Sequence, residues 1–546
     1  MISWKNFSSG LFVITACIVT PISAYAQSDA GIFSGAASLI IAMVVLLLLV
    51  IILMGERLIR TEASQVLGGE VDSNFSLLPS FSEIFGKGNN FQSDKGERHF
   101  RIRKGFNLKL EGNPEKEIKD VQGSRYAITP TSFEGISPIP KLTVDIGDYV
   151  KAGDELFYDK KRPEIRYVAP VSGEVIEVNR GAKRRIIEVV ILADKETAYK
   201  AMPGINEDNK EAIIEYLLQS GGWSMLRQRP YNIVPDPTVE PKNIFITSFD
   251  TAPFAPETAL VIDGREAELK RGLEILGKLT SGKVFLGVNG QDDHLPEVLK
   301  DDLPAEKVWF SGPHPAGNVG VQIHHIDPVR SGDVVWTLGL QELITLGALF
   351  TKGIYDASRI VSVGGNMVEN PAYVRTKMGC SIGDILKHFE LSDPEKTRII
   401  SGDVLSGVKV GKENFLGVFD DQLSLIQEGD YYETFGWLIP QKLRPSLSRT
   451  FPNFLLSGVK FQADSNTHGE RRAFVVSGQY EKVLPMDIYP QQLMKAILTN
   501  DFEKMEGLGI RELVEEDVAL CEFVCTSKMP LQKILREGLD EVHAQG

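Results

Sequence analysis

The chain of 546 residues contains four cysteines, too few for a fold stapled by disulfides. It is also short of positive charge, with 59 Lys and Arg against 73 Asp and Glu and a formal net charge of −14. This balance argues against a general nucleic-acid-binding protein, which would carry a basic face. Fifty glycines and 28 prolines argue against a helical bundle and are typical of a chain rich in turns and loops. A chain of this length should contain several domains.

Two phosphate-binding motifs are missing as well. No G-x-G-x-x-G lies between a predicted strand and a predicted helix, and no G-x-x-x-x-G-K followed by Ser or Thr occurs. The loop at residues 312–317, GPHPAG, follows a predicted strand. Its prolines lack the N–H donors that a phosphate cradle needs. We expect a rigid loop with ligand or partner contacts, and no nucleotide site.

Long apolar runs occur in the first 60 residues. Residues 1–26 have the layout of a secretory signal peptide: a basic start, an apolar stretch and a small-residue cleavage site. A second uncharged run, 36–54, is long enough for a transmembrane helix, and Arg57 and Arg60 behind it place the following chain in the cytoplasm. An uncleaved signal would form a second span and leave the body on the same side. Residues 55–98 are polar and are predicted to be a tether.

Glycines at short intervals characterise the next part of the chain. They separate runs of alternating, β-branched residues between 143 and 178, which predicts hairpins. The pattern resembles the hammerhead sandwich of biotinyl and lipoyl domains, a barrel-sandwich hybrid, and we assign it to residues 99–195. In those carriers a lysine in the central turn holds the cofactor.

The corresponding turn here holds Lys160 and Lys161, followed by Arg162 and Pro163. A biotin or lipoyl carrier modified at Lys160 or Lys161 is therefore one alternative. The turn is, however, a basic cluster stiffened by proline, and more basic residues follow at 180–185. On an acidic protein this surface is better interpreted as a docking face for a partner or for anionic headgroups.

After residue 195, apolar stretches with the period of a strand alternate with stretches that have the period of a helix. They predict a multidomain α+β and α/β chain with a Rossmann-like domain that lacks the dinucleotide loop. The assigned segments are a connecting segment at 196–242, the Rossmann-like domain at 243–355, a β-grasp-like (SLBB) unit at 356–412, a β-rich segment at 413–485 and a helical C-terminal domain at 486–546. Strands are expected at 102–108, 243–249, 259–262, 283–288 and 307–310, and helices at 211–219, 265–279 and 381–389.

Residues 223–231 combine an indole, two guanidinium groups and a phenol. Arg227, Arg229 and Tyr231 could grip a planar ring that bears oxygen atoms, because arginine donates to carbonyls and stacks on aromatic faces. The alternative is a domain-linking turn whose aromatic side chains fill a core, which is the commoner role of such residues.

Metal sites are not expected. His324 and His325 are adjacent on a predicted strand and would point to opposite faces. Cys521 and Cys525 share one face of a predicted helix, but a closed zinc or iron–sulfur site needs four ligands and the only other body cysteine is Cys380. Two small apolar residues in a helix interface are the favoured interpretation.

Stretches spread in order over residues 101–546 resemble the A subunit of the sodium-translocating NADH:quinone oxidoreductase (Na+-NQR). They are IRKGFNLKLEGNP, GDYVKAGDELFYDKK, APVSGEVIEVNRGAKR, GPHPAG, RIISGDVLSG, FGWLIP, YEKVLPMDI and EEDVALCEFVC. The resemblance implies one subunit of a translocase in a bacterial inner membrane, a complex of six subunits that oxidises NADH, reduces a quinone such as ubiquinone and exports sodium ions. Flavins and iron–sulfur centres would be on partner subunits, with no cofactor and no catalytic residue on this chain.

The resemblance also associates the chain with the quinone end of the complex. We therefore expect quinone contacts at Phe133, Ile136, Arg227, Arg229 and Tyr231, which offer an apolar surface with donors. A membrane-tethered scaffold that binds no ligand is the other alternative. The family usually lacks the first hundred residues, so the signal and span are additions here, and Thr526-Ser527 stands where Pro-Gly is common.

Overall fold

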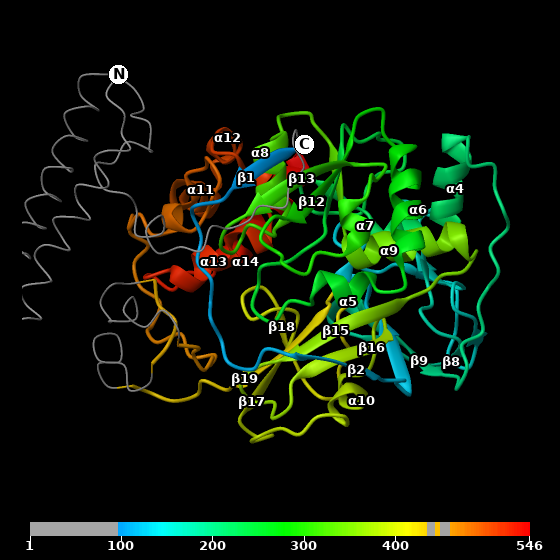
Figure 1. The fold of residues 1–546 in the computed structure, drawn as a ribbon, viewed down its shortest axis with the longest axis horizontal. Helices are drawn as coiled ribbons and strands as arrows, with labels where there is room; N and C mark the ends of the chain where they lie inside the picture. The colour runs from blue at the N-terminus through cyan, green and yellow to red at the C-terminus, as the bar shows by residue number, and fades with distance from the viewer. Residues whose placement is uncertain (1–96, 434–442, 448–458, 546) are drawn as a thin grey trace, which may run out of the picture. The chain divides into compact units, whose positions relative to one another are not determined.

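The computed structural model describes residues 97–433, 443–447 and 459–545 (Figure 1). These residues belong to one compact unit, Phe91–Gly546. Among them, no helix is long and apolar enough to cross a membrane. The predicted signal peptide at 1–26, the transmembrane helix at 36–54 and the tether up to residue 96 lie outside the described residues.

The Rossmann-like domain is built on a six-stranded sheet with the order β1-β13-β12-β11-β14-β10. Its strands are β1 (Arg98–Arg101), β10 (Arg227–Arg229), β11 (Ile244–Thr247), β12 (Val284–Asn289), β13 (Glu306–Ser311) and β14 (Val335–Gly339). All neighbouring pairs are parallel except β10 with β14. The interior strands are almost fully buried, as continuous apolar runs require in a parallel sheet covered on both faces. The parallel sheet predicted from the alternating periods is confirmed.

Helices accompany this sheet. They are α5 (Thr258–Ile262), α6 (Glu266–Gly277), α7 (Glu297–Lys300), α8 (Val319–Ile326) and α9 (Leu340–Thr351). The expected strand at 259–262 is wrong, because this short run forms α5, where the Thr258 hydroxyl donates to the Ser248 carbonyl at 2.7 Å. The strand expected at His324 and His325 is also wrong, since both lie in α8. Short apolar runs carry too little periodicity to separate helix from strand.

A second six-stranded sheet has the order β18-β17-β19-β15-β16-β2. Its elements are β2 (Glu115–Asp120), β15 (Ser358–Gly364), β16 (Ala372–Lys377), β17 (Thr397–Ser401), β18 (Val408–Val410) and β19 (Gln422–Gln427), with helix α10 (Ile382–Leu386). The first strands of the chain join other domains: β1 pairs with β13, and β2 pairs with β16 (Figure 1). The expected strand at 102–108 is absent, and Ile102 instead extends β1 by donating to the Ser311 carbonyl at 2.7 Å.

The barrel-sandwich hybrid consists of a four-stranded sheet, β3-β9-β8-β5, and a three-stranded sheet, β4-β6-β7. Its strands are β3 (Arg125–Ile128), β4 (Lys141–Leu142), β5 (Tyr149–Val150), β6 (Glu155–Tyr158), β7 (Arg166–Val168), β8 (Gly173–Arg180) and β9 (Ile186–Ala193). Gly173 has φ +153°, and a Cβ there would lie 1.9 Å from the Leu192 carbonyl oxygen. The glycine is therefore required by the close approach of β8 and β9.

Helices α4 (Lys210–Ser220), α11 (Pro490–Leu498), α12 (Phe502–Gly507), α13 (Glu515–Val524) and α14 (Leu531–Gln545) complete the described unit. The helical C-terminal region is confirmed. The β-rich segment predicted at 413–485 is wrong for most of its described residues: after β19 they form only isolated bridges and a 3-10 turn at Tyr480–Lys482. Phe461, one of its described aromatic residues, packs against Leu110 and Phe254 and forms only an isolated bridge with Leu110.

Candidate functional site

A cleft of about 590 Å³ opens at the carboxyl ends of β11 and β14. The strand order reverses at this point, because β12 and β13 continue on one side of β11 and β14 lies on the other. Such a switch point is where open α/β sheets bind their ligands. The other walls include residues between 225 and 232, 314–319, 403–406, 419–421 and the start of α13.

Carboxylates occupy the helix N-termini that would bind phosphate in a nucleotide-binding domain. Asp517 lies against the first turn of α8, where a Cβ on Gly320 would be 2.4 Å from both carboxylate oxygens. Glu342 folds back over the start of α9 in the same way, with a Cβ on Gly339 2.2 Å from its Oε2. Because negative charge already compensates the positive ends of both helices, a dinucleotide would meet repulsion at each.

Each of these carboxylates is paired with a buried arginine. Arg229 Nη1 lies 3.1 Å from Asp517 Oδ2, and Arg359 Nη2 lies 2.8 Å from Glu342 Oε1. Both arginines are only 2% exposed. The domain thus has the Rossmann outline, with ion-paired carboxylates at the two helix starts where a phosphate could otherwise bind.

The predicted rigid loop 312–317 forms part of this cleft. Its Ala316 and Gly317 N–H groups donate to the Pro313 carbonyl (2.9 Å) and the Thr251 hydroxyl (3.1 Å), so they are not available to a phosphate. His314 is buried beside the Thr251 hydroxyl, with 3.1 Å between Nδ1 and Oγ1. Burial lowers the pKa of His314, although the carboxylate of Asp250 opposes this effect.

The cleft is predominantly acidic. Desolvation by its walls raises the pKa of Asp250, Asp420 and Asp421 above the usual range of a carboxyl. It also raises the pKa of Glu516, although Arg229 Nη2 lies 2.8 Å from Glu516 Oε1 and 44% of the glutamate side chain is exposed. The cleft therefore offers a ligand both arginines and carboxyl groups. The raised pKa values of these carboxyl groups make them bind a proton at higher pH than an exposed carboxyl would.

Of two predicted site residues that lie close together, Arg227 lines the cleft and Phe133 is buried behind its wall. The Arg227 guanidinium carbon lies 3.9 Å from the ring centroid of Phe419 and 5.8 Å from that of Phe133. Arg227 Nη1 donates to the carbonyls of Ser224 (3.0 Å) and Leu226 (2.9 Å), which fixes the plane of the guanidinium. Burial lowers the pKa of Arg227 to about 10, so it remains charged at neutral pH.

Aromatic rings back this wall. The centroid of Phe133 lies 5.4 Å from that of Phe419 and 4.6 Å from that of Tyr167, in edge-to-face arrangements. Phe419 and Tyr167 were not predicted as site residues. Phe419 comes from a turn of the second sheet, almost 200 residues downstream of Arg227. The sequence around Phe419 contains no pattern that predicts its contact with Arg227.

The other three predicted residues have different surroundings. Arg229 lines the cleft but is held by its ion pairs with Glu516 and Asp517. The Tyr231 hydroxyl accepts a hydrogen bond from Arg511 Nη1 at 3.1 Å, and its ring lies 4.8 Å from that of His543. Ile136 is half-buried against the main core, and neither it nor Tyr231 lines the cleft.

Comparison with known proteins decides the family. Three family models match: the NqrA N-terminal barrel-sandwich hybrid domain at residues 100–194, the NqrA second alpha/beta domain at 208–355 and the NQRA C-terminal domain at 360–412. The A subunit of the Na(+)-translocating NADH-quinone reductase of Hahella chejuensis is 38% identical over 456 residues, 82% of this chain and 100% of that protein. The chain belongs to the NqrA family.

Other members are equally similar. The corresponding A subunit of Vibrio atlanticus is 38% identical over 452 residues, 82% of this chain and 99% of its own. That of Rhodopirellula baltica is 37% identical over 460 residues, 82% of this chain and 98% of its own. A solved NAD+-reducing NiFe hydrogenase in the air-oxidized state matches at 12% identity over 62% of each chain with a TM-score of 0.33, too low to support any inference. The sequence resemblance to the NqrA family is thus confirmed.

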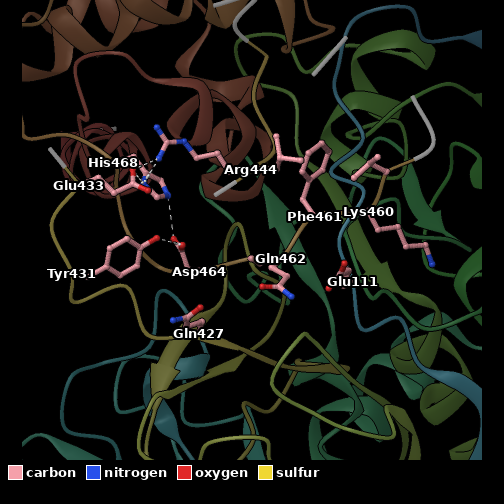
Figure 2. A pocket seen from close by; sticks show the side chains of 13 residues that line it. Glu111, Gln427, Tyr431, Glu433, Arg444, Lys460, Phe461, Gln462, Asp464 and His468 are labelled. Carbon is pink, nitrogen blue, oxygen red and sulfur yellow. Dashed lines mark hydrogen bonds and ion pairs between the residues drawn. The ribbon is translucent and has the colours of Figure 1, made fainter. Parts of the chain in front are cut away.

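A second cavity, of about 410 Å³, lies at the end of β19 and is lined by Glu111 and by residues of the segments 427–433, 443–444 and 459–468 (Figure 2). Its polar groups are paired with one another: Arg444 Nη1 with Glu433 at 2.7 Å, and the Tyr431 hydroxyl with Asp464 at 2.6 Å. His468 Nε2 lies 3.2 Å from the same Asp464. The adjoining segments 434–442 and 448–458 lie outside the described residues, so we assign this cavity no function.

Three residues considered as metal ligands, His324, Cys521 and Cys525, have protein partners, whereas the buried Nε2 of His325 has no hydrogen-bond partner among the described residues. His324 Nδ1 lies 2.8 Å from Glu512 Oε2, and its Nε2 accepts from the Asp487 N–H at 3.0 Å. Cys525 Sγ lies 2.8 Å from the Tyr480 hydroxyl, and both Cys521 and Cys525 are 1% exposed. Within the described ranges, no group of three or more His, Cys, Asp or Glu residues is placed to hold a metal ion.

Proposed function

We propose that the chain is the A subunit of a respiratory complex that couples NADH oxidation and quinone reduction to the export of sodium ions. The observation that carries this proposal is its 37–38% identity to proteins named for that role, over 98–100% of their own length. In a complex of six subunits at the bacterial inner membrane, flavins and iron–sulfur centres belong to partner subunits. The body stands on the cytoplasmic side, anchored by the span at 36–54.

Deleting the gene for this chain tests the assignment. Membranes from the deletion strain should lose sodium-dependent reduction of quinone by NADH, and the gene supplied on a plasmid should restore it. Activity that persists without the chain contradicts the assignment.

We place the contribution to the quinone end at the wall where Arg227 and Phe419 line the cleft and Phe133 packs behind them. A quinone head group is planar and bears two carbonyl oxygens, which match a guanidinium that donates at its edge and stacks on its face. Phe419 lies over the Arg227 guanidinium at 3.9 Å, is half-buried and lines the cleft, so an aromatic ligand in the cleft can extend the same stack. In this proposal Arg229 and Tyr231 hold the strand and turn that position Arg227, and Ile136 secures the loop of Phe133.

Arg227→Ala in the assembled complex tests this site. The expected result is a KM for quinone raised by roughly tenfold, the size of a lost charged hydrogen bond or stacking contact, with the complex intact. Arg375→Ala is the matched control, since Arg375 is half-exposed on β16 and pairs with Asp120 at the surface. An unchanged KM and kcat in Arg227→Ala would leave the chain as a scaffold without a quinone contact.

The carrier alternative is disfavoured by the turn that holds Lys160 and Lys161. Asp159, 0% exposed at the start of this turn, accepts hydrogen bonds from the Ser137 hydroxyl and from the Lys161 N–H. Arg162 donates to the Val234 carbonyl at 2.7 Å. A turn held by hydrogen bonds to Ser137 on one side and Val234 on the other is poorly suited to move as a carrier arm. Intact-mass spectrometry that shows unmodified lysines would exclude the carrier role.

A further inference from the structure

The tip of the β8–β9 hairpin carries a concentration of positive charge on an acidic protein. Arg180, Lys183, Arg184 and Arg185 are all exposed, and no acidic residue occurs between 180 and 187. None of the four takes part in an ion pair with another described residue. The nearest acids, Glu177 and Glu188, lie at the base of the tip, where the Asn179 amide donates to both.

The backbone of the tip does not by itself favour basic residues. Lys183 and Arg184 have φ of +54° and +61°, in the left-handed region that Gly, Asn or Asp adopt with less strain. Turn chemistry alone would therefore place other residues here. A bulky basic side chain at both positions instead presents its ammonium or guanidinium group outward from the end of the hairpin.

An apolar side chain accompanies the charges. Ile187 is 42% exposed, and its Cδ1 would lie 3.1 Å from a Cβ on Gly181, so the glycine lets it fold over the turn. An exposed apolar side chain close in sequence to several Lys and Arg residues is typical of surfaces that bind at the boundary between lipid headgroups and acyl chains. A purely electrostatic contact with an acidic protein would not require it.

We propose that the β8–β9 tip docks the body onto the anionic headgroups of the membrane to which the complex belongs. The inference rests on the proposed membrane location. The net charge of −14 opposes the approach of the chain as a whole to an anionic leaflet, whereas this basic tip is attracted to it. About 40 residues separate the predicted span from the described body, enough to cover roughly 130 Å when extended, so the anchor allows the tip to reach the surface.

The body without the span is the reagent for the test. Residues 91–546 form one compact unit, and the full-length relatives align with only 82% of this chain, so a body without the first 90 residues corresponds to complete natural proteins. This body should sediment with vesicles rich in phosphatidylglycerol and not with vesicles of phosphatidylcholine alone. Higher salt should weaken the binding, because exposed charges are screened.

A variant with Arg180→Gln, Lys183→Gln, Arg184→Gln and Arg185→Gln should bind phosphatidylglycerol vesicles more weakly by roughly several hundredfold, since each of the four basic residues contributes roughly fivefold. The control carries Lys300→Gln, Lys396→Gln, Lys504→Gln and Lys533→Gln, which remove the same charge from other exposed positions. Control binding should be unchanged, and Ile187→Asn should weaken binding several-fold.

Three results would overturn the proposal: equal sedimentation with neutral vesicles, equal losses in the two quadruple variants, or cross-linking of the tip to a protein in the assembled complex without vesicle binding. The last result would identify an acidic partner protein. Failure of the proposed function is distinguishable, because it would abolish the link to quinone reduction while leaving vesicle binding intact.

Discussion

Arg229 and Asp517 form a buried ion pair, 3.1 Å between Nη1 and Oδ2, that joins the edge strand β10 to helix α13 across 288 residues of sequence. The Asp517 side chain is 0% exposed and the Arg229 side chain 3%. Asp517 also accepts from the Val514 N–H at 3.0 Å and packs on the first turn of α8. This one ion pair thus holds the start of α13 against β10, at the place where both elements line the cleft.

Arg229→Met should destabilise the protein by about 3–5 kcal/mol, because it leaves the Asp517 carboxylate buried without its partner. Urea denaturation followed by tryptophan fluorescence measures the loss. The double variant Arg229→Met with Asp517→Leu should recover part of it. Arg375→Met, which breaks an exposed pair, should cost less than about 1 kcal/mol. Equal losses of stability in Arg229→Met and Arg375→Met would contradict the larger contribution assigned to the buried pair.

Gly347→Ala should destabilise the Rossmann-like domain by about 3 kcal/mol. The added Cβ would lie 1.8 Å from the Glu268 carbonyl oxygen, where α9 crosses α6, so the helices must separate. Gly277→Ala, at the end of α6 with open space around it, is the matched control and should be neutral or stabilising by up to about 1 kcal/mol. Thermal denaturation compares the two, and similar melting temperatures would contradict the close helix crossing.

Asp384→Asn should lower the free energy of unfolding at pH 7 by about 1–2 kcal/mol, after allowance for solvent screening. Burial opposes the shift, but the Lys387 ammonium at 2.6 Å and the Ser124 hydroxyl and N–H, both at 2.7 Å, lower the pKa of Asp384 to about 2. Since the folded pKa lies below the unfolded value of 3.8, this stability is present above about pH 4 and is lost as the pH falls toward 2.

Urea denaturation at a series of pH values between 7 and 3 tests this dependence. The difference between Asp384→Asn and the natural chain should narrow below pH 4. Asp208→Asn, at a side chain 95% exposed, should differ from the natural chain by less than about 0.5 kcal/mol. A difference for Asp384→Asn that stays constant over the whole series would argue against the lowered pKa.

Tyr167→Phe should leave stability unchanged or raise it by up to about 1 kcal/mol. The Tyr167 hydroxyl is buried and has no hydrogen-bond partner among the described residues, while its ring stacks on Phe157 at 4.9 Å, a contact that Phe preserves. Denaturation of the variant is the measurement. A loss of more than about 1 kcal/mol would mean that the hydroxyl has a partner in the folded protein.

Helices and strands with a clear pattern of apolar residues could be predicted from the sequence. The helix expected at 265–279 is α6, with Leu269, Leu273 and Leu276 fully buried on one face. The strand expected at 283–288 is β12. The run at 259–262 could not be assigned, because four apolar residues do not distinguish a helix from a strand.

Long-range pairing could not be predicted. In the sheets, Arg98 lies opposite Val308, and Tyr373 lies opposite Ile118. No local sequence pattern predicts which distant strand a given strand pairs with. The same limit applies to the cleft. The cluster around Arg227 was recognised by its composition, but Phe419 and Asp517 reach it from other domains. Composition could suggest what the cluster binds, while only the fold reveals that Arg229 is occupied by an ion pair.

The most direct test of the quinone contact is photoaffinity labelling of the assembled complex with a quinone analogue, followed by mapping of the labelled peptides. The proposal predicts label on the segments that contain Phe133, Arg227 and Phe419, suppressed by excess unlabelled quinone and reduced in Arg227→Ala. Label confined to partner subunits, with the same yield in Arg227→Ala, would contradict it.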